Sequence, residues 1–168
     1  MKVNDIRPED LVSKQQKHID SDISWLLKKT ESYIDVECPC CGSDKRNFRM
    51  LKNRFQFYDC KECYTIYMSP RPTPEILKHF YSKSQNYKFW AEIMFPRTEA
   101  KRKYIFESRV VLVEKLLKQY NPKASCLLEV GPGYGTFCRL LKDRIPFLKI
   151  EAVEPSSSLA KICKDSGI

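Results

Sequence analysis

Four cysteines in two close pairs are the strongest candidates for metal chemistry. Cys38 and Cys41 form one C-x2-C pair, and Cys60 and Cys63 form a second pair after eighteen intervening residues. Two residues between thiolates let each pair chelate one ion from a tight turn, and four thiolates suit tetrahedral Zn²⁺. Because protein would fill all four positions, we expect a structural site. Coincidental reduced cysteines and a redox dithiol stay open as alternatives. Cys40 lies inside the first pair, where it is either a spectator thiol or a replacement for a neighbouring ligand.

A second group of candidate binding residues surrounds a glycine-rich turn. An apolar run ends at Val130, three glycines follow at alternate positions, and a second apolar run ends in an acid. A strand, a glycine turn and a helix start are the layout of a nucleotide-type site at the first βα junction of a wound sheet. The candidate ligand-binding residues are Glu129, Gly131, Gly133, Gly135 and Glu154.

The details of this turn bear on the identity of the ligand. The turn reads G-x-G-x-G, and Thr136 stands where a dinucleotide fold has its third glycine. Glu129 precedes the turn, where a carboxylate would repel a pyrophosphate but can face an ammonium group. Glu154 is placed to accept hydrogen bonds from two ribose hydroxyls. S-adenosylmethionine, an adenosine that carries an amino acid, satisfies these features; another nucleotide, or a degenerate site without one, stays open as an alternative.

Two motifs in the correct order resemble class I S-adenosylmethionine-dependent methyltransferases. Glu129–Gly135 looks like motif I of that family, and Val153–Ser156 looks like its acidic motif after the second strand. The cysteine pairs and the following Ser-Pro-Arg-Pro-Thr-Pro-Glu-Ile are similar to a zinc-ribbon front end on one bacterial branch, whose members are often implicated in modifying sugars or other small metabolites. The resemblance covers about residues 36–168. It implies that Glu129 and the three glycines line the methionine side, while Glu154 holds the ribose.

The residue pattern predicts an α/β chain. We expect an N-terminal helix in residues 1–35, a zinc ribbon in 36–72 and a helical linker or lid in 73–122. Residues 123–168 are expected to begin an S-adenosylmethionine-binding Rossmann-like domain as β-α-β-α. The boundaries expected for individual elements are a first helix from Pro8 to Ser32, a hairpin turn at Lys52-Asn53, a short helix from Pro74, a long helix Thr98–Tyr120, strands Ser125–Val130 and Lys149–Glu154, and helices Tyr134–Asp143 and Ser157–Ser166.

The expected sheet is smaller than the one that the resemblance implies. A class I methyltransferase domain has seven strands, whereas this sequence supplies two of them. Parallel strands need cover on both faces and further partner strands. We therefore expect an N-terminal portion of a longer enzyme, or a partner that completes the sheet. The catalytic residues stay unassigned.

The resemblance implies transfer of a methyl group from S-adenosylmethionine to a small acceptor, such as a sugar or a sugar-derived metabolite. The alternative is a zinc-ribbon module that binds RNA or protein, with an inactive, vestigial methyltransferase part. The net charge of +9 permits a nucleic-acid partner but does not favour one, because a charge excess is more often a solvated surface. With no apolar run of ~18 residues and no signal-peptide pattern, we expect a cytoplasmic protein without a membrane partner.

The remaining cysteines and histidines are expected to have structural roles. Cys126, Cys138 and Cys163 lie among apolar neighbours, which is typical of core thiols. His18 is expected to be solvated on a polar helix face. His79, which precedes Phe-Tyr, is expected to pack and not to bind a ligand.

Overall fold

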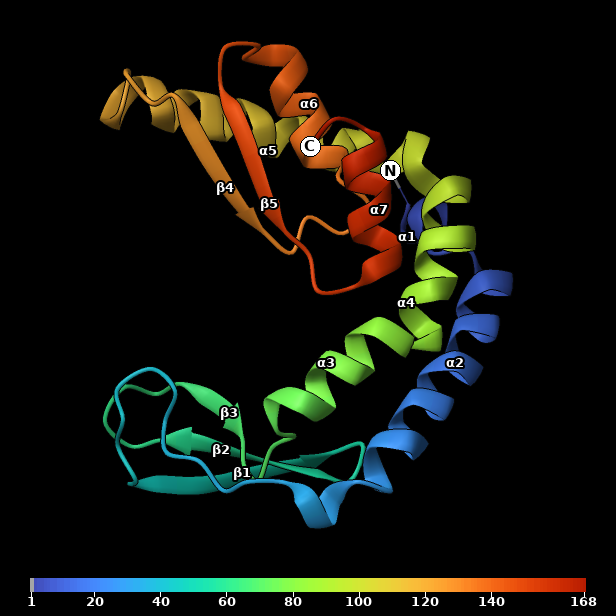
Figure 1. The fold of residues 1–168 in the computed structure, drawn as a ribbon, viewed down its shortest axis with the longest axis vertical. Coiled ribbons are helices and arrows are strands. Elements are labelled where there is room, and N and C mark those ends of the chain that lie inside the picture. Colours follow the sequence, from blue (N-terminus) through green and yellow to red (C-terminus); the bar gives the residue numbers. More distant parts are fainter. Residues whose placement is uncertain (1) are drawn as a thin grey trace. The chain divides into compact units, whose positions relative to one another are not determined.

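Helices and strands follow one another in a mixed α/β arrangement (Figure 1). The computed structural model describes residues 2–168. These residues divide into two compact units, one formed by residues 20–80 and the other by residues 2–19 with 81–168. No helix in the described part of the chain is long and apolar enough to cross a membrane.

The unit of residues 20–80 contains a three-stranded antiparallel sheet in the order β1-β2-β3, with strands β1 (Arg46–Lys52), β2 (Phe55–Cys60) and β3 (Ile66–Met68). Asn53 and Arg54 have φ of 53° and 70°. Positive φ at both central residues is typical of a type I′ hairpin turn, so the turn lies at Asn53-Arg54, one residue later than predicted. β3 was not predicted, because three residues are too few to show a strand periodicity.

Helices flank this sheet in the sequence. α2 (Glu9–Leu27) begins next to Pro8 as expected but ends before the predicted Ser32, and a short 3-10 helix, η1 (Thr30–Ser32), follows. The Thr30 hydroxyl donates to the carbonyl of Leu27 at 2.9 Å, which satisfies one carbonyl at the helix end. α3 (Pro74–Lys83) starts at the predicted proline. The His79 ring stacks on Trp25 with centroids 4.8 Å apart, so the packing role predicted for His79 is confirmed.

The second unit has a parallel pair of strands, β4 (Cys126–Val130) and β5 (Lys149–Val153), in which Leu127 pairs with Ile150. α6 (Thr136–Arg144) and α7 (Ser157–Asp165) complete the β-α-β-α order. α5 (Phe95–Tyr120) precedes the first strand. The predicted order is observed, with α6 starting two residues later than expected. It starts late because Gly135 adopts a left-handed conformation as the N-cap residue of α6.

One face of the β4–β5 pair is packed and the other is exposed. In Figure 1, α5 runs behind both strands. The packed core consists of residues from α5, α6 and the following loop, against which Leu127 and Ile150 of the strands lie: Val110, Leu141, Ile145 and Leu148. Leu128, Val130 and Val153 of the opposite face are exposed. Cys126 belongs to this exposed face, so its predicted core position is wrong, whereas Cys138 and Cys163 are buried as predicted.

A continuous helical stretch precedes the strands. α4 (Gln85–Phe89) leads through a π-helical turn, η2 (Trp90–Met94), directly into α5, which therefore starts before the predicted Thr98. The stretch packs against the start of the chain, where α1 (Val3–Ile6) was not predicted. Leu11, Phe89 and Met94 form a buried cluster. The His18 ring lies 5.0 Å from that of Phe89, so this half-buried histidine is not the solvated residue that was predicted.

Candidate functional site

The four predicted cysteine ligands lie together in the unit of residues 20–80. The Sγ atoms of Cys38, Cys41, Cys60 and Cys63 are all within 4.8 Å of one another. Cys38–Cys63 and Cys41–Cys60 are each separated by 3.5 Å. A tetrahedral zinc site with Zn–S bonds of ~2.3 Å has S–S edges of about 3.8 Å. The cluster therefore fits a structural metal ion such as Zn²⁺.

Two equivalent backbone turns bring the cysteine pairs into this arrangement. In the first turn, the Gly42 N–H donates to the Cys38 carbonyl at 2.9 Å; in the second, the Tyr64 N–H donates to the Cys60 carbonyl at 3.0 Å. Gly42 and Tyr64 have φ of 70° and 61°, so both turns close through a left-handed residue. Glycine adopts this conformation readily, whereas a tyrosine rarely does, so the second turn could not be expected from residue type. Cys40 is exposed and lies outside the cluster.

A polar network supports the segment that leads into the first cysteine pair. The Arg46 guanidinium donates to Asp35 at 2.9 Å and to the Ser69 hydroxyl at 2.8 Å, and it lies 4.3 Å from the ring centroid of Tyr58. Hydrogen bonds from Ser69 and Arg46 hold the pKa of Asp35 below its usual value. The Val36 N–H donates to the same Ser69 hydroxyl at 3.1 Å. Sequence reasoning missed this network, since its members are far apart in the chain.

The glycine-loop residues lie where β4 leaves the sheet. The Gly131 N–H donates to the Val153 carbonyl at 2.8 Å, which ties the start of the loop to the end of β5. Gly131, Gly133 and Gly135 have φ of 76°, 59° and 74°, so each residue uses the left-handed freedom of glycine. A Cβ at Gly131 would meet no atom within 4 Å, whereas a Cβ at Gly135 would lie 3.1 Å from the Sγ of Cys163.

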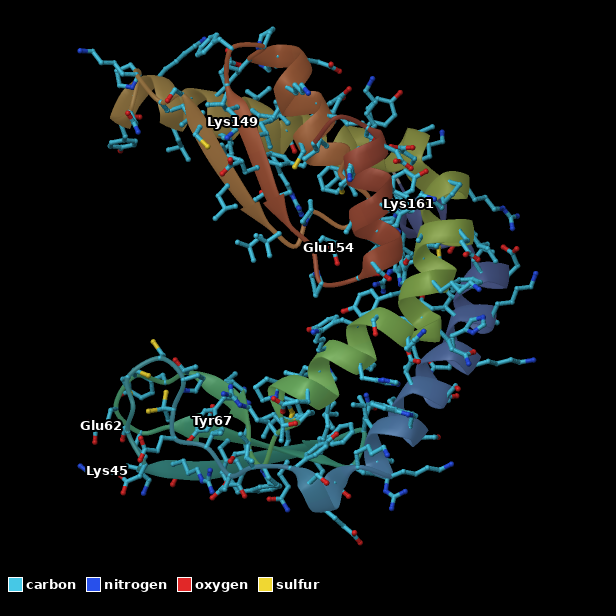
Figure 2. The ribbon with its side chains drawn as sticks, in the orientation of Figure 1. Lys45, Glu62, Tyr67, Lys149, Glu154 and Lys161 are labelled. Atoms are coloured by element: carbon cyan, nitrogen blue, oxygen red, sulfur yellow. The ribbon has the colours of Figure 1, made fainter. Side chains whose placement is uncertain are left out.

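Glu154 connects the two loops at this edge of the sheet. One carboxylate oxygen accepts from the Gly133 N–H at 3.0 Å, and the other accepts from the Ser156 N–H at 2.9 Å. Figure 2 shows Glu154 at the carboxyl end of β5, beside the loop that follows β4. The structure thus brings together Glu154 and the glycine loop, which are separated in the sequence.

Glu129 lies two residues before the loop, paired with Ala152 of β5. Burial raises the pKa of its carboxyl, while the charge of Arg109 acts in the opposite direction. Burial and the neighbouring charge of Glu129 raise the pKa of the Cys138 thiol to about 11. Glu129 therefore lies in a partly desolvated position, where a cationic partner would favour its ionised form.

Phe95 of the expected linker or lid contacts the loop, and two residues that sequence reasoning missed, Glu99 and Arg139, meet at the start of the helix that follows it. The Phe95 ring stacks on Tyr134 with centroids 5.1 Å apart and an interplanar angle of 14°. Arg139 of α6 donates to the Tyr134 carbonyl at 2.7 Å and forms an ion pair with Glu99 of α5. Phe95 could be noticed in the sequence as an aromatic residue of the expected linker or lid. The pairing of Glu99 with Arg139 could not be predicted from their positions in the sequence.

The fold and the cysteine cluster define a mixed α/β protein with a candidate structural metal site. Neither the protein-family models nor the curated proteins include a match to this sequence.

Proposed function

We propose that this chain carries the cofactor-binding elements of a class I S-adenosylmethionine-dependent methyltransferase, preceded by a zinc ribbon. The whole enzyme would transfer a methyl group to a small acceptor, such as a sugar or a sugar-derived metabolite. The observation that carries the proposal is the position of Glu154, whose carboxylate lies against the Gly133 amide at the carboxyl ends of two parallel strands. Ligands of wound α/β sheets bind at such ends.

The hydrogen bonds of the loop argue against a pyrophosphate ligand. A dinucleotide fold presents its glycine-loop amides to the pyrophosphate. Here the N–H groups of Gly131, Gly133 and Gly135 donate within the chain, to the Val153 carbonyl, the Glu154 carboxylate and the Pro132 carbonyl. Glu154 also places a negative charge at the loop. This environment favours a ligand with hydroxyl and ammonium donors over one with a diphosphate.

The space and the charges at the loop fit an adenosyl amino acid. The position of a Cβ on Gly131 is open, and the nearest atom to a Cβ on Gly133 is Cζ of Phe95 at 3.8 Å. Glu154 can accept hydrogen bonds from ribose hydroxyls, and Glu129 can balance an ammonium charge directly or through water. When bound, S-adenosylmethionine supplies an electrophilic methyl group on a positively charged sulfur. The chain would contribute by holding this donor in a fixed orientation.

Titration calorimetry of the zinc-loaded protein tests the proposal directly. We expect S-adenosylmethionine and S-adenosylhomocysteine to bind and NAD⁺ not to bind. Glu154→Gln keeps the size of the side chain but removes its charge, so it should weaken binding about tenfold or more. Glu151→Gln is the matched control: Glu151 lies on β5, which ends directly before Glu154, and it is exposed and paired with Lys149 at the surface.

The control variant should bind as the parent protein does, and circular dichroism should show that both variants are folded. Preferential binding of NAD⁺ would replace the proposal with a dinucleotide site. Absence of binding to either adenosyl compound by the folded, zinc-loaded protein would overturn it.

A further inference from the structure

We propose that Arg139 is the positioning residue of the glycine loop, which it holds in a binding-competent shape through the Tyr134 carbonyl. This inference rests on the proposed function for its consequence in cofactor binding, but the contacts themselves do not depend on any ligand. Arg139 lies on α6, outside the motif that defines the loop. It is not expected to contact the reacting atoms.

The guanidinium of Arg139 contacts the loop at Tyr134, near the end that leads into α6. Nη1 donates to the carbonyl of Tyr134 at 2.7 Å and approaches the Ser166 hydroxyl at 3.5 Å. The carbon of the guanidinium lies 5.3 Å from the Tyr134 ring centroid. A charged donor to a partly buried carbonyl forms a stronger hydrogen bond than a neutral donor does. Arg139 therefore restrains both the backbone and the ring of Tyr134.

Glu99 holds this guanidinium in place from α5. Nη2 of Arg139 contacts the Glu99 carboxylate, and the Thr136 hydroxyl donates to the same oxygen at 3.2 Å. The Arg139 and Glu99 side chains are 27% and 34% exposed, so solvent screens this pair only in part. Because two separate nitrogens are used at once, the planar fork of arginine suits the position and a lysine does not.

The restraint on Tyr134 reaches the glycines on both sides of it. The Tyr134 ring stacks on Phe95, and Cζ of Phe95 is the nearest atom to the space above Gly133. On the other side, a Cβ on Gly135 would lie 3.4 Å from Nη1 of Arg139. The bare backbone of Gly135 thus leaves room for Arg139 to reach the loop.

The same two helices provide a matched ion pair away from the loop. Arg144 of α6 pairs with Glu114 of α5, as Arg139 pairs with Glu99. Arg144→Gln removes an α5–α6 ion pair without touching Tyr134. Comparing it with Arg139→Gln separates positioning of the loop from a general loss of contact between the two helices.

Hydrogen–deuterium exchange of the zinc-loaded protein tests the inference without a ligand. The amides of Gly131, Gly133 and Gly135 are hydrogen-bonded in the loop, so local opening should be visible in a peptide spanning residues 131–136. We expect Arg139→Gln to speed exchange in this peptide about tenfold, and Arg144→Gln to leave it at the parent rate. Equal loop exchange in the two variants would overturn the inference.

Calorimetry with S-adenosylmethionine then measures the functional consequence. Arg139→Gln should weaken binding about tenfold, and Arg144→Gln should not change it. If the parent protein does not bind S-adenosylmethionine, that result counts against the proposed function. The exchange rates of the loop still test the positioning role of Arg139 in that case. Binding that is unchanged in Arg139→Gln would overturn the role of Arg139 in the cofactor site.

A charge-reversed double variant distinguishes positioning from simple pairing. Glu99→Arg with Arg139→Glu restores an ion pair between α5 and α6, but a glutamate at 139 cannot donate to the Tyr134 carbonyl. We expect the double variant to recover thermal stability relative to Arg139→Gln while loop exchange stays fast and binding stays weak. Recovery of loop protection and affinity would assign Arg139 a purely structural role and contradict the proposal.

Discussion

The carboxylate of Glu154 accepts a hydrogen bond from the Gly133 N–H at 3.0 Å, joining the loops that follow two neighbouring parallel strands. Its second oxygen accepts from the Ser156 N–H at 2.9 Å. One side chain thus fixes both loops before any ligand is present. Ligand hydroxyls would approach oxygens that are already oriented, which lowers the cost of ordering the site on binding.

The two left-handed glycines at the ends of the loop should respond differently to alanine. Gly131→Ala introduces backbone strain alone, because its Cβ would stand in open space at φ 76°. We expect it to lower the free energy of unfolding by about 1 kcal/mol. Gly135→Ala adds a close contact with Sγ of Cys163 at 3.1 Å and with Cδ1 of Ile168 at 3.3 Å. It should cost about 3 kcal/mol in urea denaturation.

The pair of variants controls itself, since both replace a glycine with similar φ in the same loop. Equal losses of stability would show that the neighbours of Gly135 move aside. In that case, Cys163 would not restrict the loop.

The part of the fold that sequence could predict is the part encoded by local patterns. The C-x2-C spacing indicated four residues that lie together in the structure, and the apolar runs predicted β4 and β5 within about one residue. The sequence motifs indicated Glu154 and the glycines as candidate site residues. The hydrogen bond between Glu154 and Gly133 is seen only in the structure.

Contacts across long stretches of sequence could not be predicted in the same way. Arg139 and Glu99 belong to different helices, and nothing in their separate surroundings indicates that they pair. The prediction of a core position for Cys126 was wrong for a different reason. An apolar strand has two faces, and the alternation of residues alone does not show which face is covered. The prediction that His18 is solvated was wrong because its partner, Phe89, belongs to a helix that is distant in the sequence.

The cysteine cluster predicts a clear difference between two cysteine-to-serine variants. The protein should bind about one zinc ion per chain. Cys60→Ser removes a buried ligand of the cluster, so the variant should lose most of its zinc and the fold of residues 36–70. Binding of structural zinc supplies ~10–16 kcal/mol in small domains, which is more than the margin of stability of such a unit. Elemental analysis and circular dichroism measure both losses.

Cys40→Ser is the matched control, because Cys40 is an exposed cysteine within the first pair and outside the cluster. It should keep full zinc content and the parent spectrum. Loss of zinc from Cys40→Ser, with retention in a Cys38→Ser or Cys41→Ser variant, would show that Cys40 replaces a neighbour as ligand.

The stacked rings of Phe95 and Tyr134 should be energetically coupled. Their centroids lie 5.1 Å apart, and such aromatic pairs contribute ~0.5–1.5 kcal/mol beyond the burial of area. We expect a double-mutant cycle with Phe95→Leu and Tyr134→Leu to give a coupling energy of about 1 kcal/mol in urea denaturation. Additive losses from the two substitutions would show that the rings do not stabilise one another.

Glu129 should make the protein less stable as pH rises. Burial raises the pKa of this carboxyl in the folded state above its usual value, and the opposing effect of Arg109 is smaller. A raised folded-state pKa contributes stability below the unfolded-state pKa, and this contribution is lost as pH rises through the folded-state pKa. A glutamine at position 129 cannot ionise. The free energy of unfolding of Glu129→Gln should therefore increase relative to that of the parent between about pH 4 and pH 7.

Urea denaturation of both proteins across this range measures the difference, and the pH dependence of the cysteine cluster cancels because both proteins share it. The same substitution removes the charge that would face an ammonium group. We therefore expect Glu129→Gln to be the more stable protein at neutral pH and the weaker binder of S-adenosylmethionine, by about tenfold in calorimetry. A stability difference that does not change with pH would show that Glu129 is fully solvated in the folded chain, and unchanged affinity would remove it from the proposed cofactor site.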